Sequence, residues 1–68
     1  MENKQLICDL LLKACQATYH AADLVSLDYD AETEVVTATF ENGYKRYANV
    51  AMDSGVATIR DIMRNLGV

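Results

Sequence analysis

Residues 2–23 carry the hydrophobic pattern of a helix that is apolar around most of its circumference. The polar side chains recur at helical spacing and fall on one narrow stripe, made of Glu2, Gln5, Asp9, Lys13, Gln16, His20 and Asp23. Almost every other position from Leu6 to Ala22 is apolar or small, so at about 100° per residue the apolar arc covers roughly 240°. The pattern predicts a helix from about Asn3 to about Ala22, built mostly from strong helix formers.

Three short segments with strand patterns follow this helix. They are predicted at Leu24–Tyr29, Glu34–Glu41 and Tyr44–Val50, and the second alternates with a period of two and is rich in Val and Thr. Residues 30–33 form the first turn, where Asp at the first position can cap the backbone. Residues 42–43 are Asn-Gly, which is the strongest hairpin signal in the chain.

Two registers are open to this second hairpin. A two-residue loop would pair Glu41 with Tyr44, whereas a three-residue loop with Gly43 in the left-handed bulge position would pair Phe40 with Tyr44. The second register gathers the apolar side chains on one face of the sheet, namely Val25, Leu27, Tyr29, Val36, Ala38, Phe40, Tyr44, Ala48 and Val50. Because a slip of one residue would turn this set to the opposite face, the pattern favours the bulged turn.

The last element is a second helix, predicted over Ser54–Leu66. Asp53 or Ser54 caps its start and Gly67 ends it as a left-handed residue. The chain holds no proline, no repeat and no linker. The sequence therefore predicts a single domain over residues 1–68 of class α+β. Its order is αβββα, a three-stranded antiparallel meander with two helices packed on one face.

The size of the chain favours self-association. A chain of 68 residues buries only about 60% of its unfolded surface, so its own core is marginal. The apolar arc of the first helix is also wider than one sheet covers. We therefore expect a homodimer, and the candidate interface comprises Cys8, Leu12, Cys15 and Tyr19 on the first helix, with Tyr47 on the outer face of the sheet. Solvated polar side chains around Tyr47 are the alternative for that outer face.

The net charge of −4 is unevenly placed along the chain. Residues 23–42 carry six acidic side chains and no basic one, while residues 43–68 carry four basic and two acidic ones. The acidic segment is interpreted as a solvated hairpin; the alternative is an acidic inhibitor or mimic that occupies a basic site on another protein. An acidic chain argues against nucleic acid as the main partner. A second alternative is weak nucleic-acid binding through the four basic residues, Lys45, Arg46, Arg60 and Arg64.

The residue types needed for catalysis or metal binding do not cluster along the chain, so we expect neither an enzyme nor a cofactor. The single histidine, His20, lies on the polar stripe, and Cys8 and Cys15 are too far apart on one helix for an intrachain disulfide. Both cysteines are expected to be small buried or interface hydrophobes of a protein in the reducing cytoplasm. Neither a signal peptide nor a membrane span is expected, because no basic leader and no apolar run of about 20 residues is present.

The hairpin from Tyr29 to Val50 resembles hairpins in small uncharacterised proteins of bacterial phages and integrative elements. Its Tyr-Asp at 29–30 and its Phe-x-Asn-Gly at 40–43 are also similar to the KTSC domain. The run at 53–55 and the Ile-Arg-Asp-Ile at 59–62 extend the first resemblance, which covers about half of the chain. The resemblance implies a small accessory protein of mobile-element origin. It assigns no catalytic residue to this chain. The functional hypothesis is a homodimeric protein-binding or regulatory module.

Overall fold

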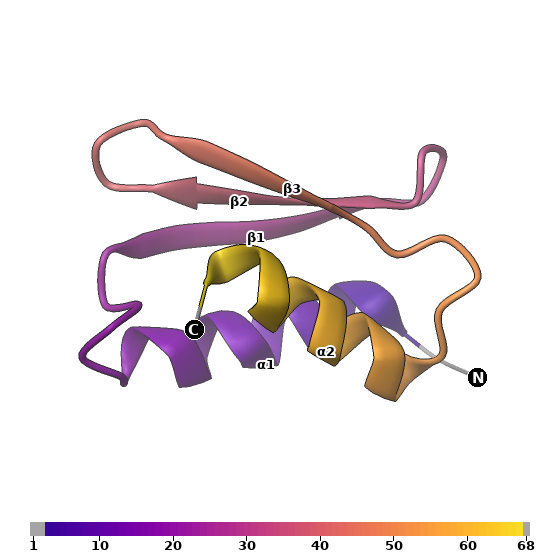
Figure 1. The fold of residues 1–68 in the computed structure, drawn as a ribbon, viewed down its shortest axis with the longest axis horizontal. Helices are drawn as coiled ribbons and strands as arrows, with labels where there is room; N and C mark the ends of the chain where they lie inside the picture. Colours follow the sequence, from indigo (N-terminus) through magenta and orange to yellow (C-terminus); the bar gives the residue numbers. More distant parts are fainter. Residues whose placement is uncertain (1–2, 68) are drawn as a thin grey trace.

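Residues 3–67 are described by a computed structural model, in which two helices and three strands follow one another along the chain. The elements are α1 (Lys4–Gln16), β1 (Leu24–Asp30), β2 (Val35–Phe40), β3 (Lys45–Asn49) and α2 (Gly55–Leu66). The strands form one antiparallel sheet in the order β1-β2-β3 (Figure 1). The predicted α+β class and the αβββα order are confirmed.

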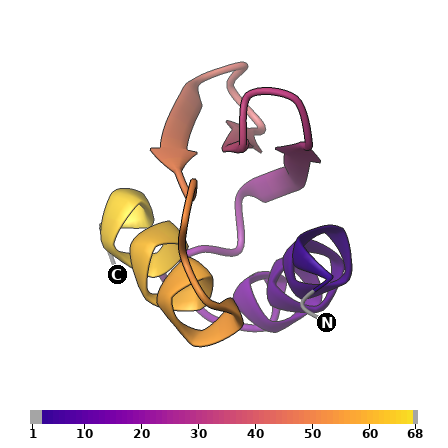
Figure 2. The same ribbon diagram turned by 90° about the vertical axis from the view of Figure 1, so that its right-hand side faces the viewer.

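Both helices pack on one face of the sheet, and the other face is open (Figures 1 and 2). The core lies between the two layers and draws on every element. Its buried side chains are Cys8, Cys15, Ala21, Leu24, Leu27, Val36, Ala38, Ala48, Val50 and Ile62. The two-layer arrangement therefore leaves two large surfaces uncovered, which are the outer face of the sheet and the outer side of the helices.

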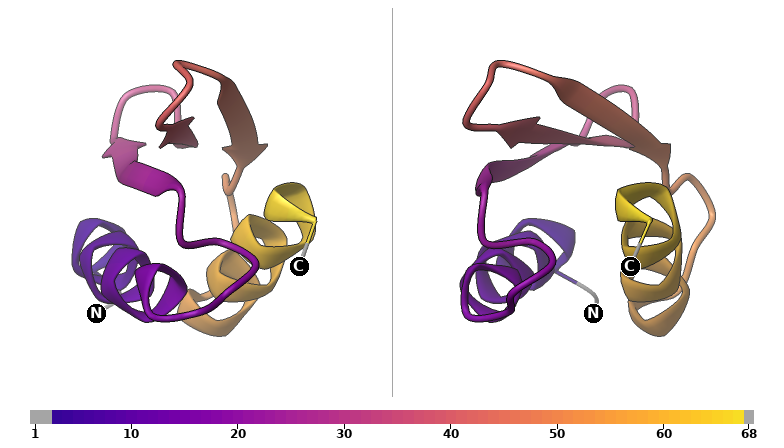
Figure 3. Two further views of the ribbon diagram at one scale, coloured as in Figure 1. Left: turned by 90° about the vertical axis from the view of Figure 1, so that its left-hand side faces the viewer. Right: turned by 60° about the vertical axis from the view of Figure 1, so that its left-hand side comes forward.

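The first helix begins where the sequence predicts but ends six residues earlier. Asn3 caps it, since its side chain accepts a hydrogen bond from the backbone N–H of Leu6 at 3.0 Å. Near its end, the hydroxyl of Thr18 donates to the carbonyl of Cys15 at 2.7 Å and accepts from the N–H of Ala21 at 3.2 Å. These bonds replace helical ones, as threonine commonly does near helix ends. Residues 17–23 form turns that swing toward α2 before the chain rises into β1 (Figure 3, left).

The faces of β1 differ from the predicted ones at its start, because the strand contains a bulge there. The pairing with β2 shifts between Leu24 and Ser26, so the alternation of side chains breaks at that point. As a result Leu24 is only 1% exposed and belongs to the core, whereas Val25 is 49% exposed. Strict alternation along the strand predicts the reverse, with Val25 on the core face and Leu24 on the outer face.

The second hairpin adopts the predicted bulged register. The N–H of Phe40 donates to the carbonyl of Tyr44 at 2.9 Å, and the N–H of Gly43 donates to the carbonyl of Phe40 at 2.9 Å. Gly43 has a φ of 82°, which glycine adopts at no steric cost. The side chain of Asn42 accepts a bond from the N–H of Tyr44 and stabilises the turn.

The second helix is bounded by the predicted caps. The hydroxyl of Ser54 accepts a hydrogen bond from the N–H of Ala57 at 3.2 Å, and Gly67 ends the helix with a φ of 77°. Ile62 faces the core, and the fully buried Thr58 donates its hydroxyl proton to the carbonyl of Ser54 at 2.9 Å. This bond satisfies the buried hydroxyl group, so the helix packs without an unpaired polar group at that point.

Candidate functional site

The five residues of the candidate interface lie in different places in one copy of the chain. Cys8 and Cys15 are 0% and 3% exposed and belong to the core, and Leu12 is partly buried against it. Tyr19 is 94% exposed in the link after α1, and Tyr47 is 61% exposed on the outer face of the sheet. The structure therefore brings the first three together inside the fold and leaves only the two tyrosines available on the surface.

The exposed side of α1 is the opposite of the one predicted. Leu6 and Leu10 are 50% and 58% exposed, and helical spacing places them across the helix from Cys8 and Cys15. The sequence pattern could not decide between the two sides, because both are apolar. On α2, Val56 is 74% exposed and also lies away from the buried Ile62 side. The exposed side of α1 thus carries an apolar row, here called the helix face and defined by Leu6 and Leu10.

Two opposite charges flank the helix face along α1. Asp9 and Lys13 are both exposed, lie four residues apart, and share the flank next to Leu6. The carboxylate of Asp9 also accepts a hydrogen bond from the side-chain amide of Gln5 at 2.8 Å. This bond holds the negative charge in place beside the apolar row.

An apolar hollow of about 200 Å³ opens beside the end of α1. It is lined by Leu11, Ala14, Cys15, Thr18, His20, Ala21 and Met63. The sulfur of Met63 lies 4.0 Å from that of Cys15 at its base. The ring of His20 packs edge-on with that of Tyr19, and the two ring centroids are 5.8 Å apart. The hollow has the apolar character of a contact surface.

The two cysteines are chemically quiet in this fold. Burial raises the pKa of the Cys8 thiol to about 11, and the nearby Asp9 and Asp28 carboxylates add to the shift. Burial also raises the pKa of the Cys15 thiol. A thiol that stays protonated at neutral pH is a poor nucleophile and a poor metal ligand. Among residues 3–67, no group of three His, Cys, Asp or Glu side chains is arranged to hold a metal ion.

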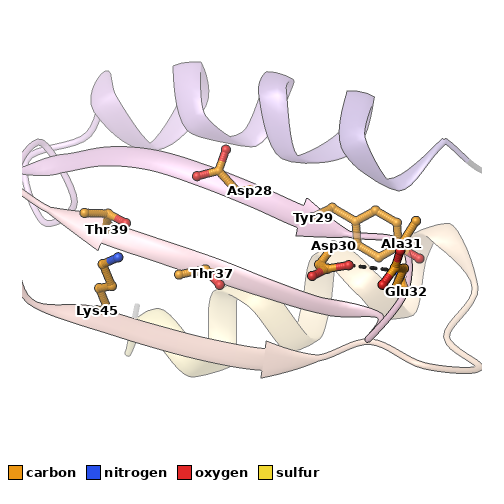
Figure 4. Close-up of a pocket in the computed structure, with 8 residues that line it drawn as sticks. All are labelled: Asp28, Tyr29, Asp30, Ala31, Glu32, Thr37, Thr39 and Lys45. Atoms are coloured by element: carbon orange, nitrogen blue, oxygen red, sulfur yellow. Dashed lines mark hydrogen bonds between the residues drawn. The ribbon is translucent and has the colours of Figure 1, made fainter.

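The outer face of the sheet is a polar, shallow surface with a hollow of about 710 Å³ (Figure 4). The strand pairing arranges its side chains in three cross-strand rows, which are Ser26–Thr39–Lys45, Asp28–Thr37–Tyr47 and Asp30–Val35–Asn49. The column on β1 is acidic, the column on β2 is neutral, and the column on β3 carries a cation and an aromatic ring. The hollow lies over the acidic side and is wide open.

One of the acidic groups in this hollow has a structural role. The carboxylate of Asp30 accepts a hydrogen bond from the backbone N–H of Glu32 at 2.8 Å (Figure 4). It accepts a second one from the backbone N–H of Thr33 at 3.4 Å. Aspartate stabilises turns in this way. These two bonds give Asp30 a structural role in the β1–β2 turn, and this role does not require a basic partner.

The basic residues do not form one continuous patch. Alternation along β3 puts Lys45 on the outer face and Arg46 on the side of the helices. The guanidinium of Arg46 donates to the carbonyl of Asn65 at 3.0 Å near the end of α2, and it lies 5.7 Å from the ring centroid of Tyr44. Since Arg60 and Arg64 lie on α2 beneath the sheet, a single stretch of nucleic acid would not reach all four cations on one flat surface.

The β1 edge of the sheet is covered by side chains of α1. At the β1 edge, the side chain of Gln5 accepts a hydrogen bond from the N–H of Tyr29 at 3.1 Å, and that of Gln16 donates to the carbonyl of Leu24 at 3.0 Å. These two bonds cover the edge with α1. Sequence reasoning missed this role, although the spacing of Gln5 and Gln16 on the polar stripe was visible.

Neither helix among residues 3–67 has the length and apolar character needed to cross a membrane. Comparison of the chain with protein-family models, with curated proteins and with solved structures finds no match. The function is therefore inferred from the surfaces of the chain itself.

Proposed function

We propose that this chain is a cytoplasmic protein-binding or regulatory module that acts as a homodimer. The observation that supports it is the helix face, where Leu6 and Leu10 of α1 remain half exposed in a chain that has little core to spare. Monomeric proteins rarely leave clustered apolar side chains uncovered without a partner. The buried, protonated state of both thiols is consistent with binding rather than catalysis.

A second copy of the chain is the occupant that the charges beside this face favour. When two α1 helices pack antiparallel across a two-fold axis, the same flank of each helix meets the other in reversed order. In the register whose two-fold axis lies level with Leu11, Asp9 of one copy lies opposite Lys13 of the other, twice in each dimer. The same surface is therefore complementary to itself in charge as well as in its apolar row.

The two alternative functions have less support. The acidic-mimic hypothesis draws on the carboxylates around the outer hollow, but Asp30 already caps the β1–β2 turn. Nucleic-acid binding draws on four cations that lie on different faces, with Arg46 tied to the end of α2. The hairpin's resemblance to those of phage and integrative-element proteins supports an accessory role in such an element.

Light scattering behind a sizing column tests the homodimer directly. At micromolar concentration the wild type is expected at about twice its 7.5 kDa mass. Leu10→Asp is expected to run as a folded monomer, because it places a carboxylate in the apolar row of each copy. Met52→Asp is the matched control, since Met52 is 99% exposed in a loop outside the helix face. A monomeric wild type contradicts the homodimer, and a dimeric Leu10→Asp contradicts this choice of interface.

A charge exchange tests the antiparallel arrangement. Asp9→Lys alone puts two like charges together at each contact and is expected to weaken the dimer. The double change Asp9→Lys with Lys13→Asp is expected to restore it, because the opposite charges are again paired. If the double variant is as weak as the single one, the two α1 helices do not meet in this register.

A further inference from the structure

The β3 edge of the sheet is not covered by hydrogen bonds from any other segment of residues 3–67. The bonds from Phe40 N–H to the Tyr44 carbonyl and from Val50 N–H to the Glu34 carbonyl bracket the β2–β3 ladder. Antiparallel pairing alternates, so Arg46 and Ala48 bond to β2 while Lys45, Tyr47 and Asn49 direct their N–H and C=O groups away from the sheet. Among residues 3–67 no side chain bonds to these outward groups, in contrast to the glutamines at the β1 edge.

The charge of β3 argues against a second copy at this edge. Its five residues include Lys45 and Arg46 and no acidic side chain. Antiparallel pairing of two β3 strands about Tyr47 would place Lys45 opposite Asn49 and Arg46 opposite Ala48. Four cations would then share one ladder without an opposite charge, and cationic edge strands are a known device against such self-pairing.

The same charges favour an acidic strand. Opposite charges in facing positions of neighbouring strands stabilise a sheet, and an unpaired edge supplies the backbone bonds. We propose that β3 is the acceptor edge for an extended acidic segment of a partner protein, which adds to the sheet as a fourth strand. This inference rests on the proposed protein-binding function and assigns its partner a chemistry.

The geometry specifies what the added segment looks like. Its residues opposite Lys45 and Tyr47 lie on the outer face, and its residue opposite Arg46 lies on the helix side. Acidic side chains are expected opposite the two cations. An aromatic or β-branched side chain is expected opposite Tyr47, whose ring is 61% exposed and would be covered. The homodimer contact on the helix face leaves this edge free.

A peptide titration tests the proposal. The probe is an acetylated and amidated peptide of three Thr-Glu-Glu repeats, which places glutamates opposite Lys45 and Arg46 and a β-branched threonine opposite Tyr47. The control is the same peptide with lysine for glutamate. In ¹⁵N-labelled protein, the glutamate peptide is expected to shift the amide signals of Lys45, Tyr47 and Asn49 and to slow their hydrogen exchange. Binding is expected to saturate with a Kd below about 1 mM and to weaken with salt. The lysine peptide is expected to leave these signals unchanged.

Two variants separate backbone pairing from other contacts. Tyr47→Pro removes an outward N–H without touching the β2–β3 bonds, as proline is tolerated on edge strands. It is expected to bind the glutamate peptide about three- to tenfold more weakly than Tyr47→Ala, which keeps the donor, because one backbone hydrogen bond is lost. Lys45→Glu, on the exposed outer face, is expected to bind the lysine peptide more tightly than the glutamate peptide. This second variant tests the proposal even if Tyr47→Pro does not fold.

The outcomes distinguish this inference from the homodimer. No saturable shift at β3, or shifts confined to α1 or the outer hollow, overturns the inference. Amide protection of β3 that grows with protein concentration in the absence of peptide also overturns it, in favour of a second copy. A dimeric mass without peptide binding removes the inference alone, whereas a monomer that binds the peptide at β3 removes the homodimer alone.

Discussion

The side-chain oxygen of Gln5 accepts a hydrogen bond from the backbone N–H of Tyr29 at 3.1 Å, across 24 residues of sequence. With the bond from Gln16 to the carbonyl of Leu24, it fixes α1 along the outer edge of β1. Two residues on one polar stripe thereby replace the neighbouring strand that this edge lacks. The sheet is left with one covered edge, at β1, and one open edge, at β3. A further strand could therefore add to the sheet only at β3.

The first prediction concerns these glutamines. Gln5→Ala and Gln16→Ala are each expected to lower the free energy of unfolding by about 1 kcal/mol, the typical net value of one such bond. Arg64→Ala, at an exposed position of α2 outside the proposed dimer contact and without a side-chain bond to the sheet, is the control and is expected to cost less. Urea denaturation measures the three values.

Hydrogen exchange adds a site-specific check on the same contact. In Gln5→Ala the amide of Tyr29 is expected to exchange faster, while that of Arg46 in the central ladder is unchanged. Equal stability of Gln5→Ala and the wild type, with unchanged exchange at Tyr29, would show that the edge is held by other contacts.

The second prediction concerns the β2–β3 turn. Gly43→Val is expected to destabilise the protein by about 1–2 kcal/mol, because a β-branched residue resists the left-handed backbone. The φ of Gly43 is 82°, and nothing lies within 4 Å of an added Cβ, so the cost is one of backbone conformation alone. Gly43→Asn is the matched variant and is expected to lose clearly less, since asparagine tolerates this region. Wild-type stability in Gly43→Val would contradict the bulged turn.

The features predicted correctly from the sequence are those that local chemistry determines. The register of Phe40 against Tyr44 follows from the Asn-Gly turn together with the apolar alternation of the two strands. The cap at Ser54, one of the two positions predicted, follows from the preference of that side chain for helix starts. Each of these signals is contained within a few residues, so no distant contact is needed to read it.

The features that were missed depend on contacts between distant segments. The end of α1 at Gln16 is decided by the chain reversal through Thr18 and by the packing of residues 17–23 beside α2. Which side of α1 meets the sheet is decided by that same reversal, and both Leu10 and Cys8 satisfy a helical apolar pattern. The bulge at Val25 leaves no signature in alternation, since Leu24 and Val25 are both apolar and either one could face the core.

The third prediction concerns the buried thiols. Cys8 and Cys15 are expected to react with a disulfide reagent in the folded protein only as fast as the fold opens, and at once in denaturant. Tyr19→Cys is the control, because position 19 is 94% exposed and its thiol is expected to react immediately. Immediate reaction of both native cysteines would place them on the surface.

The buried Cys8 thiol is also expected to make the free energy of unfolding depend on pH in the alkaline range. The pKa of Cys8 rises from its ordinary 9.0 to about 11 on folding. A raised pKa means that the unfolded chain loses its proton first, so the contribution of Cys8 is complete below pH 9.0 and is lost as the pH rises toward 11. Cys8→Ala is expected to flatten that part of the stability profile. An identical decline in the variant would assign the loss to other groups.

The fourth prediction concerns how the stability of the fold depends on pH in the acidic range, through two carboxyl groups near the start of α2. The Asp61 carboxyl, which can share a proton with Asp53, raises the pKa of Asp53 above its ordinary 3.8. Burial and the Asp61 charge add to this, and Lys4 and Arg60 oppose it. One Asp53 oxygen is also buried without a hydrogen-bond partner among the described residues.

Because folding raises the pKa of Asp53, the folded chain holds this proton more tightly than the unfolded chain, and stability increases as the pH falls through that pKa. Asp53→Asn mimics the protonated side chain. It is therefore expected to melt at a higher temperature than the wild type at neutral pH, with a difference that shrinks on acidification. Glu41→Gln, in the β2–β3 turn, controls for the loss of one negative charge. An Asp53→Asn variant that is less stable than the wild type at neutral pH would show that the charge of Asp53 supports α2 instead of opposing Asp61.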